Sequence, residues 1–441
     1  MRIVRIFILK WKYLFTTCMV VCLMVLYLPT HQNDRSQSSN GEMLELKKVL
    51  DNTKVTRQSE SHEELSNNES HAFKFTSAIG SPFFVERLLT YSEISLRERL
   101  TCQADKNASP KLILVWDSNH SQENLGGCLD WNCEIVHDKQ KLDLADAVLI
   151  AHSYQGFSRT NSEQYVIYFS QESPAHSDFY VFQPDFFNFS LGFRHDTPAS
   201  SPYGYTVKLA HESTLSGEVI DLATIDRKKK GAAWFVSNCI TYSMRENYVN
   251  ELKKYFPVDI YGKCGSFECI RGGECEKMLD EDYHFYVAFE NSVCKDYITE
   301  KLWNQGYQRS IVPIVLKRSI VERFVPPHSF IAADDFKSPK DLAVYLHYLM
   351  NNKTAYAEFF SWRRQYKVVF LDGKFHDNLE RPWGFCQICR LLWEKPRPRL
   401  SITDFADWWR NSCERKGTLV NELIRLDSAS KTNFPEVGLT V

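Results

Sequence analysis

The segment between Phe285 and Leu316 constrains the fold more than any other part of the sequence. It begins with an aromatic and β-branched run, residues 285–289, that predicts a buried strand. Asp296 is then a candidate N-cap for a helix that ends near Gly306. A second apolar run, residues 311–316, predicts another strand. Strand, helix and strand in this order form a βαβ unit, and such units bind ligands where the strand ends and the helix begins.

A charged pair stands in the first turn of this predicted helix. Lys301 is a cation at a position where the helix dipole prefers an anion. A phosphate bound by Lys301 and the backbone N–H groups would remove that conflict. Glu300 beside it suits a neutral polyol such as a ribose. The alternative is that both side chains are simply solvated, and their spacing does not decide between the two interpretations.

A second unit of the same kind precedes the first. Residues 232–238 predict a strand, apolar side chains at helical spacing follow, and residues 258–262 predict the next strand. Arg245 lies in the first turn of the helix between them, as Lys301 does in the later unit. Two such cations from two units are suited to clamp one pyrophosphate.

The first half of the chain contains three further apolar runs, at residues 111–116, 147–151 and 165–169. Repeated buried strands predict a parallel sheet with both faces covered. Glu172 follows the third strand, and a partly buried carboxylate at that place is a candidate general base. The alternatives are a solvated glutamate before a proline turn, and His176 as the base.

Three of these motifs resemble the signature of the α1,3-fucosyltransferase family, which is glycosyltransferase family 10. They are Phe-Glu-Asn-Ser at residues 289–292, Asp-Tyr-Ile-Thr-Glu-Lys-Leu-Trp at 296–303 and Val-Pro-Ile-Val-Leu at 312–316. The resemblance extends over residues 110–415, and the central motif is its most specific part. It implies an α/β, GT-B-like protein in which two Rossmann-like domains face a cleft. It also implies an inverting enzyme that moves fucose from GDP-fucose to GlcNAc of glycoprotein glycans.

The resemblance also implies roles for particular side chains. It makes Glu172, in a Glu-Ser-Pro segment, the general base. It places Arg245 and Lys301 at the β-phosphate of the donor, and it places Glu300 with Tyr297 at the ribose or fucose. The side chains expected to bind the donor are Ser237, Asn238, Arg245, Tyr286, Asn291, Tyr297, Glu300 and Lys301. For Tyr286 and Tyr297 the alternative is core packing.

No cofactor is expected to be required besides the donor substrate. The acidic run Asp280–Asp282 invites a metal site, but it precedes a strand, whereas a metal that serves a substrate belongs after one. No metal ligands are therefore named, and stimulation by Mn²⁺ or Mg²⁺ stays open.

The N-terminus predicts a membrane anchor. Residues 1–12 carry the basic side chains of a cytosolic tail, and residues 13–28 are uncharged and mostly apolar, at the short end of what spans a bilayer. A cleaved signal peptide is the alternative, but no small-x-small cleavage site follows Leu28. Residues 29–80 are polar and predict a stem. This plan, a single-pass type II protein with a lumenal body, is also what the resemblance implies for a Golgi glycosyltransferase.

The body divides into predicted parts at a charged run, Asp226–Gly231, which is interpreted as a solvated linker. Residues 81–225 are expected to bind the acceptor and residues 226–375 to bind GDP-fucose. Residues 376–441 form a C-terminal segment that the resemblance links back to the first domain. The net charge of −2, with both signs mixed, gives no indication of a nucleic-acid partner.

Cysteine usage favours an oxidising compartment. Of thirteen cysteines only Cys18 and Cys22 fall in the predicted anchor, and the odd remainder leaves at least one free or paired between chains. Cys386 and Cys389 form a C-x-x-C pair that lacks the second pair a zinc site needs and the context of a redox motif. Structural disulfides are the simplest interpretation. The resemblance implies the pairs Cys128–Cys386 and Cys133–Cys389.

Pairing is left open for Cys102, Cys239, Cys264, Cys269, Cys275, Cys294 and Cys413. Acceptor sequons for N-glycosylation, which are also typical of a secretory chain, occur at Asn68, Asn107, Asn119, Asn188 and Asn352.

The acceptor is not fixed by the sequence. Vertebrate Lewis-type members of the family carry a double-histidine motif where this chain has only His152. Core GlcNAc of an N-glycan and outer, Lewis-type GlcNAc are both compatible with the motifs. A different class of function, a non-catalytic sugar- or nucleotide-binding lumenal protein of the same fold, is the alternative, and the presence of Glu172, Arg245, Glu300 and Lys301 argues against it. The oligomeric state and the release of a soluble form stay open.

Overall fold

The structure is a computed structural model that describes residues 72–77, 80–177, 183–270 and 272–431. The chain divides into two units, Met1–Glu69 and Ser70–Val441, and all described residues belong to the second. The predicted cytosolic tail (1–12), the anchor (13–28) and most of the stem (29–80) lie outside the described residues. Within the described part, no helix combines the length and apolar composition that crossing a membrane requires.

The first half contains a five-stranded parallel sheet with the strand order β4-β3-β5-β6-β7. Its strands β3, β5 and β6 lie where the three apolar runs predicted them, β7 lies in the aromatic stretch that follows, and β4 was not predicted. The bounds are β3 Lys111–Val115, β4 Cys133–Val136, β5 Ala147–Ile150, β6 Tyr165–Ser170 and β7 Phe189–Gly192.

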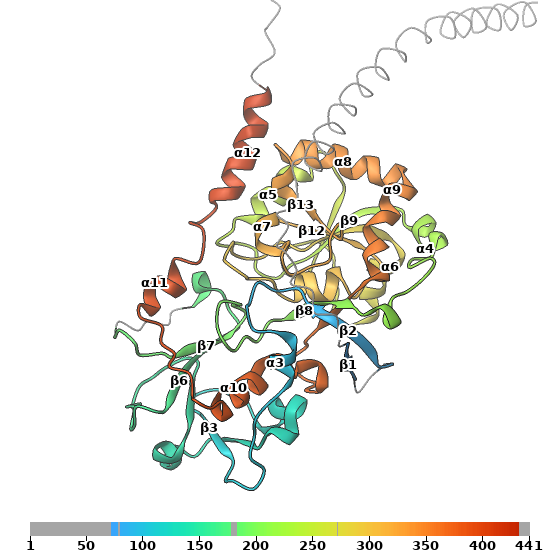
Figure 1. The fold of residues 1–441 in the computed structure, drawn as a ribbon. Helices are drawn as coiled ribbons and strands as arrows, with labels where there is room; N and C mark the ends of the chain where they lie inside the picture. The colour runs from blue at the N-terminus through green and yellow to red at the C-terminus, as the bar shows by residue number, and fades with distance from the viewer. Residues whose placement is uncertain (1–71, 78–79, 178–182, 271, 432–441) are drawn as a thin grey trace, which may run out of the picture. The chain divides into compact units, whose positions relative to one another are not determined.

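Both faces of this sheet are covered by helices that come from the C-terminal end of the chain (Figure 1). Helix α10 (Gly384–Trp393) packs on one face, against side chains such as Ile113 and Leu149. Helix α11 (Phe405–Arg410) packs on the other face, against their sequence neighbours Leu114 and Val148. Because successive side chains of a strand point to opposite faces, strands covered on both sides are apolar at most positions.

The second half contains another five-stranded parallel sheet, with the order β10-β9-β11-β12-β13. Helices α5, α8 and α12 contribute to the core on one face, while the short helix α6 and the side chains of Leu302 and Trp303 contribute to the other. The bounds are β9 Lys230–Phe235, α5 Arg245–Leu252, β10 Val258–Tyr261, α6 Met278–Glu281, β11 Tyr283–Val287, β12 Val312–Val315, β13 Ile331–Ala332, α8 Pro339–Asn351 and α12 Thr418–Lys431.

Both sheets therefore share one topology. In each, the first strand in sequence lies between the second and the third, so the chain leaves the central strand in both directions along the sheet. This is the doubly wound arrangement that binds ligands at the carboxyl ends of the strands beside the switch point. The prediction of an α/β protein with two Rossmann-like sheets is confirmed.

A third, antiparallel sheet was not predicted and joins distant parts of the chain. Its order is β1-β2-β8-β14, with β1 Phe73–Phe75, β2 Phe83–Leu88, β8 Gly204–Leu209 and β14 Tyr366–Phe370. Strand β1 lies inside the expected stem, so the folded body begins before residue 81. Strands β8 and β14 come from the two expected domains and pair with each other, so the sequence boundaries at residues 225 and 375 do not separate independent bodies.

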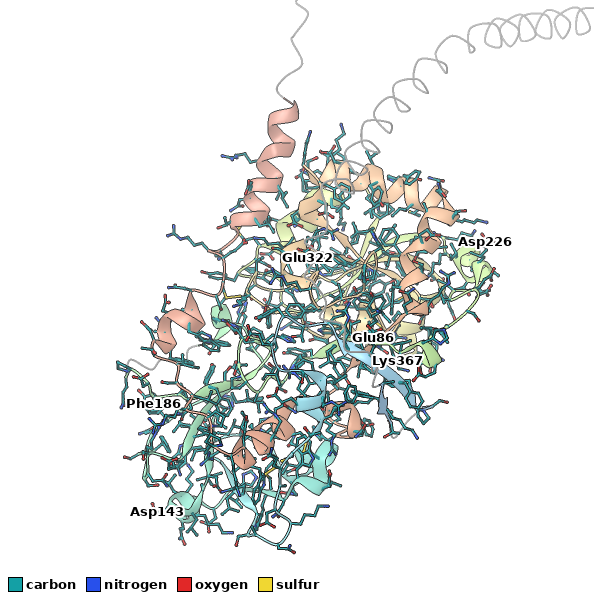
Figure 2. The ribbon with its side chains drawn as sticks, viewed as in Figure 1. Glu86, Asp143, Phe186, Asp226, Glu322 and Lys367 are labelled. Atoms are coloured by element: carbon teal, nitrogen blue, oxygen red, sulfur yellow. A yellow bond between two sulfur atoms is a disulfide. The ribbon has the colours of Figure 1, made fainter. Side chains whose placement is uncertain are left out.

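The interpretation of the charged run 226–231 as a solvated linker is wrong, because the run overlaps a helix (Leu222–Arg227) and strand β9, and Lys228 between them is buried. Asp226, labelled in Figure 2, is exposed and pairs with Lys353. Lys228, in contrast, is 3% exposed, and its Nζ donates to the carbonyl oxygens of Leu279 (3.0 Å), Asp280 (2.7 Å) and Tyr283 (2.7 Å). Burial lowers the pKa of Lys228 to about 8.

Disulfides attach the C-terminal segment to both halves. The structure joins Cys128 to Cys386 and Cys133 to Cys389, which are the pairs the resemblance implied. The segment is nevertheless not confined to the first half, because α12 contacts α5 and α8 of the second half. The pairs that the sequence left open are Cys239–Cys264, Cys269–Cys275 and Cys294–Cys413, and Cys102 is free within the described residues.

Shorter helices complete the described part. They are α3 Leu96–Leu100, η1 Gln122–Trp131, η2 Lys139–Leu144, η3 Pro174–His176, η4 His211–Ser213, α4 Leu222–Arg227, η5 Glu274–Lys277, η6 Lys301–Gly306, α7 Arg318–Val321, η7 Ala333–Asp335, α9 Lys353–Ala357, η8 Glu358–Arg364 and η9 Asn378–Glu380.

Candidate active site

The predicted donor residues gather at the carboxyl ends of two neighbouring strands. Ser237 and Asn238 follow β9 and are exposed. Residues 288–300, here called the donor loop, follow β11 and lead into η6. Strands β9 and β11 are parallel and hydrogen-bonded, with Ala233 opposite Tyr286, so the two loops leave the sheet at the same edge. This edge is the switch point of the second sheet, where the fold places ligands.

Arg245 is the first residue of α5, as predicted, and it is 3% exposed. Its Nη1 donates to the carbonyl oxygen of Phe289 (2.5 Å), its Nη2 donates to that of Asn238 (3.4 Å), and the guanidinium lies over the Trp234 ring. Its Nε is buried and has no hydrogen-bond partner in the described part of the chain. Burial lowers the pKa of Arg245. The residue links the β9 loop to the donor loop.

Lys301 is the first residue of η6, and its ammonium is held by three side chains. Its Nζ lies 2.8 Å from Thr299 Oγ1, 3.0 Å from Glu290 Oε2 and 3.5 Å from Glu300 Oε1. The helix is a π-helix, a form that is frequent at functional sites. The arrangement keeps a cation, with Glu300 beside it, at the N-terminal end of the helix.

Asp296 does not cap this helix, and that prediction is wrong. Asp296 has a left-handed backbone (φ +61°) and its carboxylate is buried, accepting from the Tyr91 hydroxyl and from the backbone N–H of His195 (2.9 Å). Burial raises the pKa of Asp296. The N-cap position belongs to Glu300. The carboxylate that local rules assign to a helix end thus joins the donor loop to the first half of the chain.

Glu290 is a site residue that the sequence did not single out. Its Oε1 accepts from the backbone N–H and from the hydroxyl of Thr299 (both 2.8 Å), and its Oε2 faces Lys301. Glu290 therefore ties the beginning of the donor loop to its end. The residue lies within the Phe-Glu-Asn-Ser motif, but the motif does not reveal which groups the carboxylate touches.

Of the other predicted donor residues, Tyr286 is packed in the core and Asn291 lies at the end of a strand. Tyr286 is 1% exposed and packs edge-on against Phe235 in the core, so the packing alternative describes it better than a ligand contact. Burial raises its pKa. Asn291 is half-buried at the strand end, where its carbonyl oxygen accepts from Ser243 N (2.8 Å) and its Oδ1 accepts from the Ser292 hydroxyl.

Glu172 meets the donor loop from the other half of the molecule. It follows β6, and its Oε2 accepts a hydrogen bond from the Tyr297 hydroxyl at 3.3 Å. The adjacent Ser173 forms a 2.6 Å hydrogen bond with Ser292. Partial burial of Glu172 was expected, but the residue is exposed and open to an incoming substrate. His176 has no such contact in the described structure, so of the two candidate bases it is Glu172 that contacts the donor loop.

The predicted glycosylation sites differ in their surroundings. Asn107 and Asn119 are exposed. Asn188 is enclosed: its Nδ2 donates to the Leu400 carbonyl oxygen (2.7 Å) and its Oδ1 accepts from Val166 N (2.7 Å), which argues against a glycan there. Asn352 caps α9 through its Oδ1. Asn68 lies outside the described residues.

The described side chains do not form a metal centre. In the described ranges, no group of three or more His, Cys, Asp or Glu side chains is arranged to hold a metal ion.

Two family models match the chain in successive segments. "Fucosyltransferase, N-terminal" covers residues 108–204, and "Glycosyltransferase family 10 (fucosyltransferase) C-term" covers residues 225–408. The first segment contains the parallel sheet that carries Glu172, and the second contains the sheet that carries Arg245 and Lys301.

Known proteins give the same result. The chain is 50% identical over 430 residues to "Alpha-(1,3)-fucosyltransferase fut-1" of Caenorhabditis elegans, covering 96% of this chain and 99% of that protein. It is 35% identical over 291 residues to "Glycoprotein 3-alpha-L-fucosyltransferase A" of Drosophila melanogaster, covering 63% of this chain and 54% of that protein. It is 34% identical over 304 residues to the human "4-galactosyl-N-acetylglucosaminide 3-alpha-L-fucosyltransferase FUT6", covering 65% and 80%.

A solved structure, "Crystal Structure of alpha1,3-Fucosyltransferase with GDP-fucose", superposes with a TM-score of 0.43 at 17% identity, over 70% of this chain and 96% of the other. The family models and the nematode relative settle the relationship: this chain belongs to glycosyltransferase family 10, the fucosyltransferases.

Proposed function

We propose that the chain is an inverting α1,3-fucosyltransferase that moves fucose from GDP-fucose to GlcNAc of glycoprotein glycans. The observation that carries the proposal is the hydrogen bond between the Tyr297 hydroxyl and Glu172. Tyr297 stands in the same short segment as Glu300 and Lys301, so the candidate base of one half contacts the segment of the other half that carries the candidate phosphate-binding group. Family membership supports the reaction class.

The chemistry follows from this arrangement. Glu172 accepts the proton of the acceptor hydroxyl, the hydroxyl oxygen bonds to the anomeric carbon of fucose, and the bond from that carbon to the diphosphate breaks. One displacement inverts the configuration. Negative charge develops on the leaving diphosphate, where Arg245 and Lys301 stabilise it. Fixed charges of this kind supply the largest single contribution in many enzymes.

Glu300 is proposed to bind a hydroxyl of the ribose or fucose. It lies beside Lys301 at the start of η6, with its carboxylate 3.5 Å from the ammonium. Ser237, Asn238 and Asn291 are proposed to complete the donor contacts from the ends of β9 and β11. No cofactor is proposed, and adding Mn²⁺, Mg²⁺ or a chelator to the assay below measures any stimulation by metal.

The compartment is part of the same proposal. Residues 13–28 anchor the chain in the Golgi membrane as a single-pass type II protein with a lumenal body. The basic residues before the apolar stretch support this orientation, and the disulfides of the described structure support an oxidising lumen. Asn107 and Asn119 are the sites proposed to carry glycans.

The test compares Glu172→Gln with the wild-type chain. The substitution removes the base and keeps the shape, so fucose transfer should fall by about 10²–10⁴-fold, while GDP affinity measured by calorimetry stays within about twofold of wild type because the cation pair is intact. Glu163→Gln, on the exposed loop before β6, is the matched control and should transfer normally.

The acceptor is settled by the same assay. Wild-type protein is offered N-glycans with a free core GlcNAc and glycans with outer N-acetyllactosamine. Transfer to one class identifies the acceptor. If the wild-type chain binds GDP but transfers to neither class, the catalytic proposal is wrong and a binding function replaces it.

A further inference from the structure

One short segment near the C-terminus contacts three loops of the donor end at once. We call residues 411–417, between α11 and α12, the C-terminal brace. On the donor loop, Cys413 is disulfide-bonded to Cys294. The backbones of the two segments also pair as an antiparallel bridge, in which Lys295 N donates to the Ser412 carbonyl oxygen and Glu414 N donates to that of Val293, both at 2.8 Å.

The brace also fixes the loop that carries Arg245. Gly417 N donates to the Tyr242 carbonyl oxygen at 2.9 Å. Gly417 has φ +66°, and a Cβ added there would lie 2.2 Å from the sulfur of Met244. Met244 is the N-cap residue of α5, immediately before Arg245. The brace therefore bonds to the backbone of this loop at Tyr242 and packs closely against the side chain of Met244, the residue before Arg245.

The third contact lies on the loop after β12. Glu414 forms an ion pair with Lys317, and both side chains are about one-third exposed or less. Strands β9, β11 and β12 are neighbours in the sheet, and the brace contacts the loop at the carboxyl end of each. A disulfide, backbone hydrogen bonds and an ion pair thus join the brace to three loops at one edge of the sheet.

We propose that the C-terminal brace is a positioning element of the transfer reaction, holding the segments that carry Arg245 and Lys301 at the separation that the donor diphosphate requires. The inference rests on the proposed function, because it assigns the diphosphate to these two cations. A loop that is ordered before binding does not lose that conformational freedom when the ligand arrives, so preorganisation acts on affinity. The brace should thus govern donor binding more than the chemical step.

The first variant is Cys294→Ala/Cys413→Ala in the full chain. The KM for GDP-fucose should rise on the order of tenfold, equivalent to about 1.4 kcal/mol, while kcat at saturating donor and the KM for acceptor change by no more than about twofold. Cys269→Ala/Cys275→Ala is the matched control, because it removes a disulfide of the same half that does not touch the donor loop. Its donor KM should equal that of wild type.

A second variant covers the case in which loss of the disulfide prevents folding. Gly417→Ala pushes Met244 away and should raise the donor KM in the same way. Gly373→Ala is its control, because Gly373 has a similar backbone (φ +68°) with open space where the Cβ would lie. Both alanines carry the same backbone strain, so a difference between them reports the contact with Met244.

Hydrogen exchange gives a readout that does not depend on turnover. Backbone amides of the donor loop should exchange faster in the Cys294/Cys413 variant than in wild type, and saturating GDP should restore their protection. Equal donor KM values in each variant and its control would overturn the proposal, as would a loss confined to kcat. If the wild-type chain does not bind GDP at all, the proposed function fails first, and the two failures are distinguishable.

Discussion

At the scale of single residues, the donor end keeps charged side chains in places that are costly without a ligand. Arg245 is buried with one N–H that has no partner among the described residues, and Lys301 is a cation in the first turn of a helix. Buried charge and an opposed helix dipole each cost free energy. A diphosphate between the two cations would remove both costs. We therefore expect GDP to stabilise the fold as well as to bind to it.

Glu290 should contribute to stability although the sequence assigned it no role. Glu290→Gln keeps the oxygen that accepts from Thr299 but removes the charge that faces Lys301. Removing one charge of a buried ion pair costs about 3–5 kcal/mol of unfolding free energy. Because Glu300 also lies close to Lys301, the loss here should be smaller, about 1–3 kcal/mol. Urea unfolding measures the loss and an assay measures donor KM. Unchanged stability would show that Glu300 fully replaces Glu290.

Lys228 predicts a pH dependence of stability in alkaline solution. Its folded pKa of about 8 lies below the ordinary lysine value, so between about pH 8 and 10 the unfolded chain binds more protons than the folded chain. The free energy of unfolding contributed by Lys228 should therefore rise through this window, by about 2–3 kcal/mol. Wild type and Lys228→Met are unfolded in urea at each pH. The rise should be absent in the variant, and parallel curves would refute the prediction.

At the scale of elements, a single side chain joins two loops at the switch point of the first sheet. The Asp117 carboxylate, after β3, accepts from the backbone N–H groups of Ala151 (2.7 Å), His152 (2.7 Å) and Ser153 (2.5 Å), after β5. This is the sheet edge where Glu172 also emerges. The bonds give the loop that carries His152 one shape, on the side of the molecule proposed to receive the acceptor.

Asp117→Ala should therefore impair acceptor binding and spare donor binding. Three backbone N–H groups lose an ionised partner, and each such bond contributes about 1.5–3 kcal/mol. The acceptor KM should rise by about tenfold or more, with GDP affinity unchanged. Asp143→Ala, at the exposed aspartate labelled in Figure 2, is the control. A variant with normal acceptor KM would place the acceptor elsewhere.

The elements that the sequence predicted well are those whose burial is uniform. Strands β3, β5, β6, β9 and β11 are covered on both faces, so each contains a mainly apolar run that sequence analysis detects. Although β1 and β2 pair locally, the antiparallel sheet escaped prediction because its inner strand β8 pairs with β2 and with β14 across more than 100 residues. Such pairing depends on which segments the rest of the fold brings together, and no local pattern encodes it.

The site shows the same division. Arg245 and Lys301 lie at the starts of their helices, as predicted, because their place in a βαβ unit is a local property. Asp296 was assigned to a helix end, but bonds from Tyr91 and His195, about 100 or more residues away, outweigh the local preference for capping. Glu290 was missed because residue type alone does not show that its carboxylate faces Thr299 and Lys301.

At the scale of the whole molecule, two disulfides join the first half to α10, and each closes nearly the same long loop of the chain. Cys128–Cys386 and Cys133–Cys389 have sequence separations of 258 and 256. Once one of these disulfides has formed, the other closes a loop of only the few residues between Cys128 and Cys133 and between Cys386 and Cys389. Their contributions to stability are therefore not additive.

Removing one pair should cost much less than removing both. In the chain-entropy model a loop of this size is worth roughly 5 kcal/mol, whereas the second closure is worth roughly 2–3 kcal/mol. Cys133→Ala/Cys389→Ala should thus lose about 2–3 kcal/mol of unfolding free energy, and the fourfold alanine variant roughly 7–8 kcal/mol. Denaturant unfolding of both variants measures the difference. Equal losses of unfolding free energy on removing the first and the second pair would contradict the conclusion that both disulfides close the same loop.

The late position of α10 has a consequence for synthesis of the chain. The last strand of the first sheet ends at Gly192, but the helix that covers one of its faces begins at Gly384. A ribosome adds the intervening roughly 190 residues in about 10–40 s at typical rates. During that time the nascent sheet lacks the helix that buries one of its apolar faces. A message truncated before the codon for Gly384 should therefore yield a product that quality control retains and degrades, even though every strand of the first sheet has been made.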